Sequence, residues 1–370
     1  MGNYLAGERV ASVIQQFSPC TVVNHYALDD YAPELAEFGY KMRRLGAKAE
    51  DEKDRSATYL SLIRDIESLI AARIQKKETP FVIDRELLCR LRQEQENQTA
   101  LFIFVKGVAF TALQSALHPK TITANFVTNA GLLDLSIHRV FPDYHFVPNE
   151  MAQKKVVEFG CESDKVFILG PTIELERPKY SNLSPLNARM ACVLLNGDPK
   201  NYPAIINQIC KTKIDTRLIV ISPDSELDLS KGLPPYSEHI VELEILDKLP
   251  QQEFRDRLEK MAAHPQSVFI SKSGPNSFFE AIGAGLIPII HWSGLPPEKW
   301  VCELANSQEL GVSYNSQEEL CANILERIDD ASFLTLARQK VDHKKLDLRN
   351  SNWKEKFKKH LAAILEMKRG

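Results

Sequence analysis

The sequence contains no CxxC pair, although it has seven cysteines scattered along its length. Nothing in their spacing resembles a disulfide framework or a zinc site, so we expect reduced, mostly buried thiols and no bound metal. The N-terminus has no basic segment followed by an apolar run, the pattern of a signal peptide. Together these absences favour a cytoplasmic protein.

The sequence also lacks a dominant charge sign and a long hydrophobic run. Its 46 Lys and Arg residues nearly balance 49 Asp and Glu residues, which argues against a polycationic protein that grips nucleic acid. The most apolar stretch, residues 100–117, is interrupted by Lys106 and Gly107. A membrane-spanning helix needs about 20 apolar residues, so we interpret this stretch as a buried strand (101–105) followed by a helix.

The length of 370 residues exceeds that of an ordinary single domain and predicts two. Short apolar runs alternate with amphipathic helical patterns, which is typical of parallel sheets covered by helices on both faces. The expected strands are 21–24, 101–105, 122–127, 144–147, 165–169, 191–195, 217–221, 239–243, 267–270 and 287–291. The expected helices include 7–16, 51–73, 151–159, 202–211, 250–263, 276–284 and 317–329.

A proline-containing stretch with few apolar residues, 172–188, interrupts this alternation and is the expected linker. We therefore predict an N-terminal domain over 1–172, a C-terminal domain over 189–330, and helices over 331–370 that pack back toward the N-terminal domain. From residue 340 onward, the chain has ten Lys or Arg residues and only four Asp or Glu residues, which gives this tail a net charge of +6. We interpret this tail as a docking helix with a solvated basic face; the alternative is a peripheral contact with an anionic membrane.

The most informative segment follows the expected strand 267–270. Gly274 permits a close approach of the backbone, and Pro275 suits the first turn of a helix. The backbone N–H groups of Asn276 and Ser277 would then point out of the helix end and offer an anion site suited to a diphosphate. One turn later, Glu280 is placed to accept hydrogen bonds from a ribose diol. The alternative is an ordinary strand-to-helix turn.

This segment, written Ser271-Lys-Ser-Gly-Pro-Asn-Ser-x-x-Glu280-Ala-x-x-x-Gly285-Leu-x-Pro288, resembles the sugar-nucleotide loop of GT-B glycosyltransferases. Within them it is most similar to the monogalactosyldiacylglycerol synthases, which are related to the N-acetylglucosaminyltransferase that makes lipid II. Further segments resemble motifs of that branch in the same order, namely 126–129 (FVTN), 145–150 (HFVPNE), 160–166 (GCESDKV), 170–173 (GPTI), 295–298 (LPPE) and 310–312 (LGV).

The resemblance implies an α/β protein of GT-B fold, with two doubly wound Rossmann-like domains facing a cleft. It implies a hexosyltransferase that moves a sugar from a nucleotide-sugar, usually a UDP-sugar, to an unknown acceptor held by the N-terminal domain. No metal or cofactor is implied, and no Asp-x-Asp motif lies in a suitable place. By matching positions, the implied donor-binding residues are Gly197, Ser273, Gly274, Pro275, Asn276 and Ser277 around the nucleotide and diphosphate, Glu280 at the ribose, and Glu298 near the sugar hydroxyls. His291 is a further candidate for a donor contact, because it stands at the end of the expected strand 287–291.

The N-terminal part departs from the family pattern. The first strand of its sheet is absent, so either the chain starts late or the sheet has lost a strand. Asn3 stands where the family has its candidate catalytic histidine, and Asn129 replaces a second carboxylate. The remaining candidates for acid–base chemistry are His138, Asp134 and His25.

These departures leave other functions open. A non-catalytic relative would bind nucleotide-sugars as a sensor or scaffold. An epimerase of related fold would need carboxylates in the cleft, and the sequence offers no convincing set. For location, we expect a cytoplasmic protein, and peripheral contact with the inner face of the membrane is the alternative that the basic tail leaves open.

Overall fold

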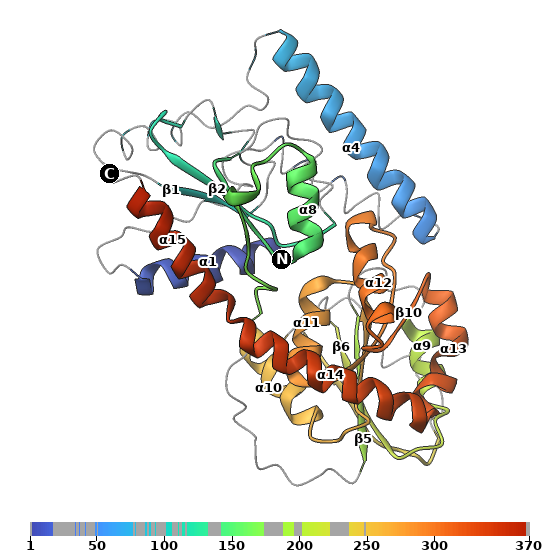
Figure 1. Cartoon of the computed structure of the whole chain (residues 1–370). Helices are drawn as coiled ribbons and strands as arrows, with labels where there is room; N and C mark the ends of the chain where they lie inside the picture. Colours follow the sequence, from blue (N-terminus) through green and yellow to red (C-terminus); the bar gives the residue numbers. More distant parts are fainter. Residues whose placement is uncertain are drawn as a thin grey trace. The chain divides into compact units, whose positions relative to one another are not determined.

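The computed structural model describes residues 2–17, 51–76, 101–105, 117–131, 142–173, 188–195, 202–222, 237–247 and 249–367, with a few isolated positions between them. The chain divides into two compact units, each built on one parallel sheet (Figure 1). The N-terminal unit comprises 1–49, 54–172 and 351–370, and the C-terminal unit comprises 50–53 and 173–350.

The described strands of the N-terminal unit form one parallel sheet in the order β1-β2-β3-β4. They are β1 (Leu101–Phe104), β2 (Ile122–Phe126), β3 (Tyr144–Val147) and β4 (Val166–Ile168). The described helices of this unit are α1 (Gly2–Phe17), most of α4 (Glu52–Gln75), α8 (Glu150–Glu158) and α15 (Trp353–Met367), with a short helix over Ser163–Lys165.

The core of the N-terminal unit is aromatic and joins distant parts of the chain. Phe126 of β2 and Phe146 of β3 both contact Phe357 of α15 edge to face, with ring centroids 5.8 and 4.9 Å apart. Trp353 of α15 meets Phe126 in the same way. Helices α1 and α15 lie side by side on this core (Figure 1). The apolar residues of the tail, spaced at helical intervals, are therefore buried within the N-terminal unit.

The C-terminal unit contains a six-stranded parallel sheet in the order β10-β9-β8-β5-β6-β7. Its strands are β5 (Arg189–Leu194), β6 (Thr216–Ile221), β7 (Ile240–Leu246), β8 (Val268–Lys272), β9 (Ile287–His291) and β10 (Val312–Tyr314). This is the doubly wound Rossmann order: the chain builds outward from β5 to β7, then returns to β8 and builds the other way. The strand order reverses between β5 and β8, the point where such sheets bind ligands at the carboxyl ends of the strands.

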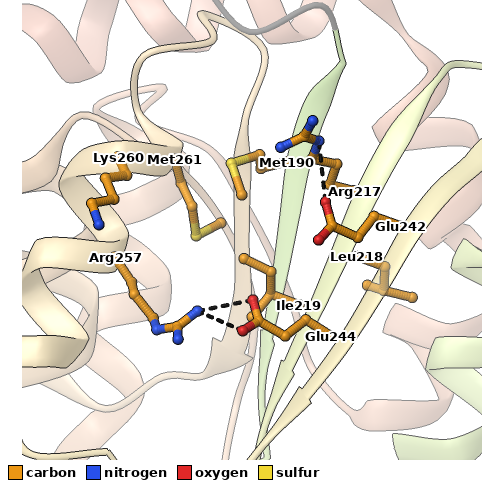
Figure 2. A pocket seen from close by; sticks show the side chains of 9 residues that line it. All are labelled: Met190, Arg217, Leu218, Ile219, Glu242, Glu244, Arg257, Lys260 and Met261. Carbon is orange, nitrogen blue, oxygen red and sulfur yellow. Dashed lines mark hydrogen bonds and ion pairs between the residues drawn. The ribbon is translucent and has the colours of Figure 1, made fainter. Parts of the chain in front are cut away.

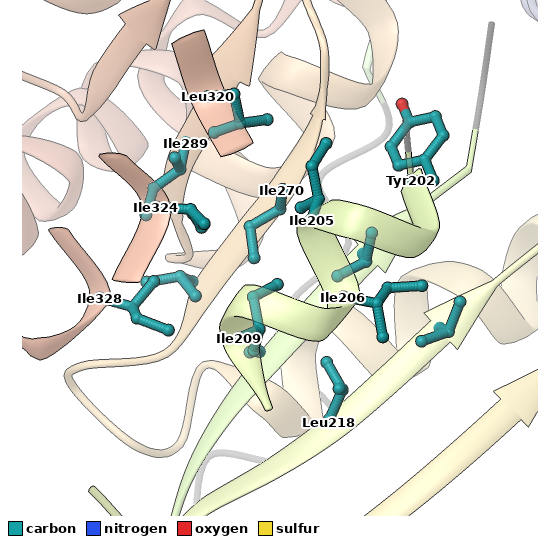
Figure 3. Close-up of a cluster of buried hydrophobic side chains, with 14 of the residues drawn as sticks. Tyr202, Ile205, Ile206, Ile209, Leu218, Ile270, Ile289, Leu320, Ile324 and Ile328 are labelled. Carbon is teal, nitrogen blue, oxygen red and sulfur yellow. The ribbon is translucent and has the colours of Figure 1, made fainter. Parts of the chain in front are cut away.

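Helices cover both faces of this sheet. One face carries α9 (Tyr202–Ile209), α13 (Gln317–Asp329) and the start of α14 (Ala331–Ser351), and the other carries α10 (Gln251–Met261) and α11 (Pro275–Ala284) (Figure 1). The short helix Pro296–Glu298 leads into α12 (Lys299–Ser307). Isoleucines of α9 and α13, among them Ile205, Ile209 and Ile324, meet strand residues such as Leu218 and Ile270 in a fully buried cluster (Figure 3). Strands apolar on both faces are what such a sandwich requires.

The predicted α/β fold with two Rossmann-like parallel sheets is confirmed. Most expected strands fall within two residues of the observed ones, but β7 continues to Leu246, and β10 was not expected. The expected strand 21–24 lies outside the described residues. Over the described part of the chain, no helix is both long and apolar enough to cross a membrane.

Candidate functional site

The candidate site begins where β8 ends. The chain leaves β8 at Lys272, turns through Ser273 and Gly274, and enters α11 at Pro275. The turn is fixed by backbone hydrogen bonds: Ser273 N–H donates to the His291 carbonyl of β9 at 2.8 Å, and Gly274 N–H donates to the Lys272 carbonyl at 2.8 Å. Gly274 is the N-cap residue of α11, and Pro275 occupies the first turn as expected.

Helix α11 begins without a side-chain cap. Its first intrahelical backbone bond runs from Phe278 N–H to the Gly274 carbonyl at 3.1 Å. The N–H groups of Asn276 and Ser277 precede that bond, so they belong to the donors that a helix leaves open at its start. Asn276 and Ser277 are half-buried, and the turn lies beside the topological switch point. The local geometry can therefore accept an anion.

Glu280 lies one turn into α11 and faces α10. Its Oε1 accepts a hydrogen bond from Gln251 Nε2 at 3.2 Å and lies 3.9 Å from Arg255 Nε. The Glu280 and Arg255 side chains are 10% and 11% exposed. The carboxylate is thus held in place by α10, and two oxygens leave further acceptor capacity for a ligand hydroxyl.

Glu298 is the acceptor at the centre of a second group of polar side chains, at the same edge of the sheet. Its carboxylate oxygens lie 3.1 and 3.3 Å from Lys272 Nζ at the end of β8, and the Ser293 hydroxyl donates to Oε2 at 2.5 Å. Ser293 in turn donates its backbone N–H to the Ser273 hydroxyl at 3.3 Å. The loops after β8 and β9 are thereby tied together by polar side chains.

Lys272 and Ser293 were not among the predicted site residues. Lys272 stands inside the quoted loop motif, and a lysine directly after a buried strand is a usable signal for a site residue. Ser293 gave no signal in the sequence, because its role depends on the pairing of β8 with β9.

His291, the last residue of β9, is almost fully buried, at 2% exposure. Its Nδ1 lies 2.9 Å from the Trp292 carbonyl oxygen, and its ring meets Tyr202 of α9 edge to face at 6.2 Å. Its backbone carbonyl accepts the Ser273 N–H, so His291 shapes the turn before α11. A direct donor contact by its side chain stays a prediction.

The remaining predicted residues are not placed. His25, Asp134, His138 and Gly197 all lie outside the described residues. Asn129, which replaces a family carboxylate, accepts the Gly131 N–H at 3.0 Å with its side-chain oxygen and so supports a local turn. Among the described residues, no group of three or more His, Cys, Asp or Glu side chains is arranged to hold a metal ion.

A pocket of about 120 Å³ lies elsewhere in the C-terminal unit, between the sheet and α10 (Figure 2). Met190 and Arg217, which line it, are the second residues of β5 and β6, so the pocket lies toward the amino ends of these strands. Arg257 crosses it and donates to both carboxylate oxygens of Glu244 at 2.9 and 2.8 Å. The pocket is therefore distinct from the candidate site, and its two arginines, Arg217 and Arg257, pair with Glu242 and Glu244.

Comparisons by sequence give no relatives: no model of a known protein family matches, and no curated protein matches. Comparison by structure finds proteins of similar fold. A structure of Arabidopsis thaliana UGT89C1 complexed with UDP-L-rhamnose is 11% identical, with a TM-score of 0.50 over 75% of this chain and 76% of that one. Phytolacca americana UGT2 complexed with UDP-2fluoro-glucose and pterostilbene is 13% identical (TM-score 0.49; 84% and 81% covered). Anabaena HepE in complex with UDP-glucose is also 13% identical (TM-score 0.48; 76% and 82% covered). At these identities the likeness shows the fold alone, and the protein has the GT-B fold, with two Rossmann-like domains.

Proposed function

We propose that the protein is a glycosyltransferase that binds a nucleotide-sugar, specifically a UDP-sugar, in its C-terminal unit and transfers the sugar to an acceptor. The observation that carries this proposal is the uncapped start of α11 after the Ser273–Gly274 turn, with two carboxylates, Glu280 and Glu298, nearby in the same unit. An open helix N-terminus favours a diphosphate, and carboxylates accept hydrogen bonds from ribose and sugar hydroxyls.

The chemistry would rest on the backbone rather than on a metal. As the sugar leaves, negative charge grows on the departing diphosphate. The N–H groups of Asn276 and Ser277 and the positive end of the α11 dipole are fixed in advance and stabilise that charge. The acid–base partner for the acceptor is proposed among His25, Asp134 and His138, on the strength of the sequence.

Three features support the proposed donor. The loop motif resembles that of UDP-sugar enzymes. A solved structure of similar fold, with a TM-score of 0.50, holds UDP-L-rhamnose. The site lies at the carboxyl edge of a doubly wound sheet, beside the reversal of strand order. We also propose, from the loop motif and the further segments that resemble motifs of the same branch, that the chain lies nearest the monogalactosyldiacylglycerol synthase and lipid II branch.

Calorimetric titration with UDP tests the proposal. We expect UDP to bind the wild-type protein and Glu280→Ala to weaken binding by about tenfold or more, because a hydrogen bond to a charged group is lost. The matched control is Glu244→Ala, which removes a carboxylate paired with Arg257 at the distinct pocket and should leave UDP affinity unchanged. Absence of UDP binding to the folded wild-type protein, or equal affinity in Glu280→Ala, would contradict the proposal.

Turnover separates the enzyme from a non-catalytic relative. Release of UDP from UDP-sugars, alone and with a panel of lipid and sugar acceptors, is expected for a transferase. Binding without release under any condition would favour the sensor or scaffold, an interpretation supported by Asn129 in place of a carboxylate. Peripheral membrane contact through the basic tail, residues 340–370, is proposed on its charge alone, since the apolar side of α15 is buried.

A further inference from the structure

A compact charged group joins the two loops of the candidate site. Lys272 Nζ lies 3.1 and 3.3 Å from the two oxygens of Glu298, and Ser293 donates to one of them at 2.5 Å. The lysine and glutamate side chains are only 20% and 12% exposed. Most of both charged side chains is therefore withdrawn from water.

A contribution to the stability of the fold does not explain why this ion pair is present. Removing two charges from water costs about as much as their attraction returns, so a largely buried ion pair contributes little net stability. The pair also lies beside the proposed diphosphate site: Lys272 Cε is 3.8 Å from the position that a Cβ on Gly274 would occupy. Its position points to a role in handling a ligand.

We propose that Lys272 is a positioning residue for the donor sugar, and that the Lys272–Glu298 pair restricts donors to neutral hexosyl groups. The inference rests on the proposed function, since it assumes a nucleotide-sugar at the start of α11. Lys272 acts through Glu298: together with Ser293 it holds the carboxylate in one orientation. A carboxylate has about four acceptor sites. Lys272 and Ser293 occupy three of them, so about one remains for a hydroxyl of the sugar.

The charge of the pair sets the selectivity. A hydroxyl donates to Glu298 and is attracted by it, whereas the carboxylate of a uronosyl group would lie next to a like charge. The cation beside it, Lys272, lies against Glu298 and offsets only part of this repulsion. Like charges in a partly desolvated site repel strongly, so discrimination of about tenfold or more against a uronosyl donor is expected.

Calorimetric affinities for UDP, UDP-glucose and UDP-glucuronate test this. The wild-type protein should bind UDP-glucose at least about tenfold more tightly than UDP-glucuronate. Glu298→Gln removes the negative charge and keeps that of Lys272, so this ratio should fall to one or below. Lys272→Met leaves Glu298 uncompensated and should increase the ratio, while affinity for UDP alone changes by less than about threefold. If the two residues only stabilised the fold, Glu298→Gln and Lys272→Met would not shift the ratio of the two sugar-nucleotide affinities in opposite directions.

The matched control is Lys340→Met, which breaks the Lys340–Glu309 pair, also 3.1 Å long but about half exposed and on α14. It should leave all three affinities unchanged. If Lys272→Met does not fold, two other variants still test the inference. Lys272→Arg keeps the ion pair and should keep the wild-type affinity ratio, whereas Glu298→Gln should lower it.

Two results would contradict the inference while leaving the proposed function intact. One is a wild-type protein that binds UDP but shows no preference between the two sugars. The other is a Lys272→Met variant in which UDP and UDP-glucose lose affinity equally, which would make Lys272 a phosphate ligand. Failure of the wild-type protein to bind UDP would instead remove the proposed function, and this inference with it.

Discussion

Gly311 lies directly against the carbonyl group of Pro288: a Cβ on Gly311 would fall 1.9 Å from the Pro288 oxygen. Pro288 is in β9, and Gly311 precedes β10, which pairs with β9. Only a residue without a side chain allows the chain to enter β10 at this point. The obstacle is backbone, which cannot rotate away as a side chain can.

Gly311→Ala is therefore expected to destabilise the protein by about 3 kcal/mol, the upper end of overpacking costs, because the backbone of β9 or β10 must shift. Urea unfolding followed by circular dichroism measures it. Gly160→Ala is the matched control, since Gly160 has a φ of +103° but nothing lies within 4 Å of the position that a Cβ there would take. It should cost about 1 kcal/mol, from conformation alone. Equal costs for the two variants would remove the steric explanation.

A buried arginine ties the start of β5 to the end of α13. The Arg189 side chain is fully buried, donates to Thr216 Oγ1 at 2.8 Å, and pairs with Asp329 Oδ1 at 2.9 Å. Asp329 is 22% exposed and also accepts the Thr212 hydroxyl at 2.6 Å. Burial lowers the pKa of Arg189, and its charge depends on Asp329 for compensation.

Asp329→Asn is expected to lower the free energy of unfolding by about 3 kcal/mol, since it leaves a buried guanidinium without a counter-charge. The same substitution in an exposed pair provides the comparison. Asp342 pairs with Arg338 on α14 and is 51% exposed, so Asp342→Asn should cost less than about 1 kcal/mol. If Asp329→Asn costs no more than Asp342→Asn, the buried pair does not stabilise this unit as argued.

The sequence predicts the site loop well because its signals are local. An apolar strand, the Gly274–Pro275 step and a helix follow one another within a few residues, and the structure shows the strand ending at Lys272 and the helix starting at Pro275. The central strands of the six-stranded sheet are predictable for the same reason, since they contain continuous apolar runs, whereas the edge strand β7 carries Glu242 and Glu244. Strand β10 was not predicted because Ser313 interrupts it and leaves no apolar run.

The side-chain pairings of the site depend on tertiary structure. Lys272 and Glu298 are 26 residues apart, and they meet only because β8 and β9 are neighbours in register. Arg189 and Asp329 are 140 residues apart, and no local pattern connects them. Glu280, chosen for its place one turn into α11, also has partners on α10 that periodicity does not reveal.

His145 of β3 is a buried imidazole with a thiol as its neighbour. It is 1% exposed, and its Nε2 lies 3.3 Å from Cys161 Sγ after α8. Its Nδ1 is buried with no hydrogen-bond partner among the described residues. Burial lowers the pKa of His145 from 6.5 to about 4 and raises the pKa of Cys161 to about 11, so both groups are neutral near pH 7.

The low pKa of His145 determines whether acid stabilises or destabilises the folded protein. Between pH 6.5 and about 4, His145 is protonated in the unfolded chain but neutral in the folded protein. The unfolded state therefore binds more protons, and the free energy of unfolding falls as the pH drops through this window. His145→Leu removes the titrating group and should flatten that part of the pH profile. Little stability should be lost at pH 7, because one ring nitrogen has no partner to lose. Urea midpoints from pH 7 to 4 provide the measurement.

His343→Leu is the control, since His343 is exposed on α14 and its replacement should leave the acid slope as it is in the wild-type protein. Carboxylates also titrate at low pH, but they contribute equally to all three proteins, so the difference between the profiles isolates His145. A wild-type and a His145→Leu profile that run parallel from pH 6.5 to 4 would mean that the imidazole is reached by water and protonates in the folded protein as it does in the unfolded chain.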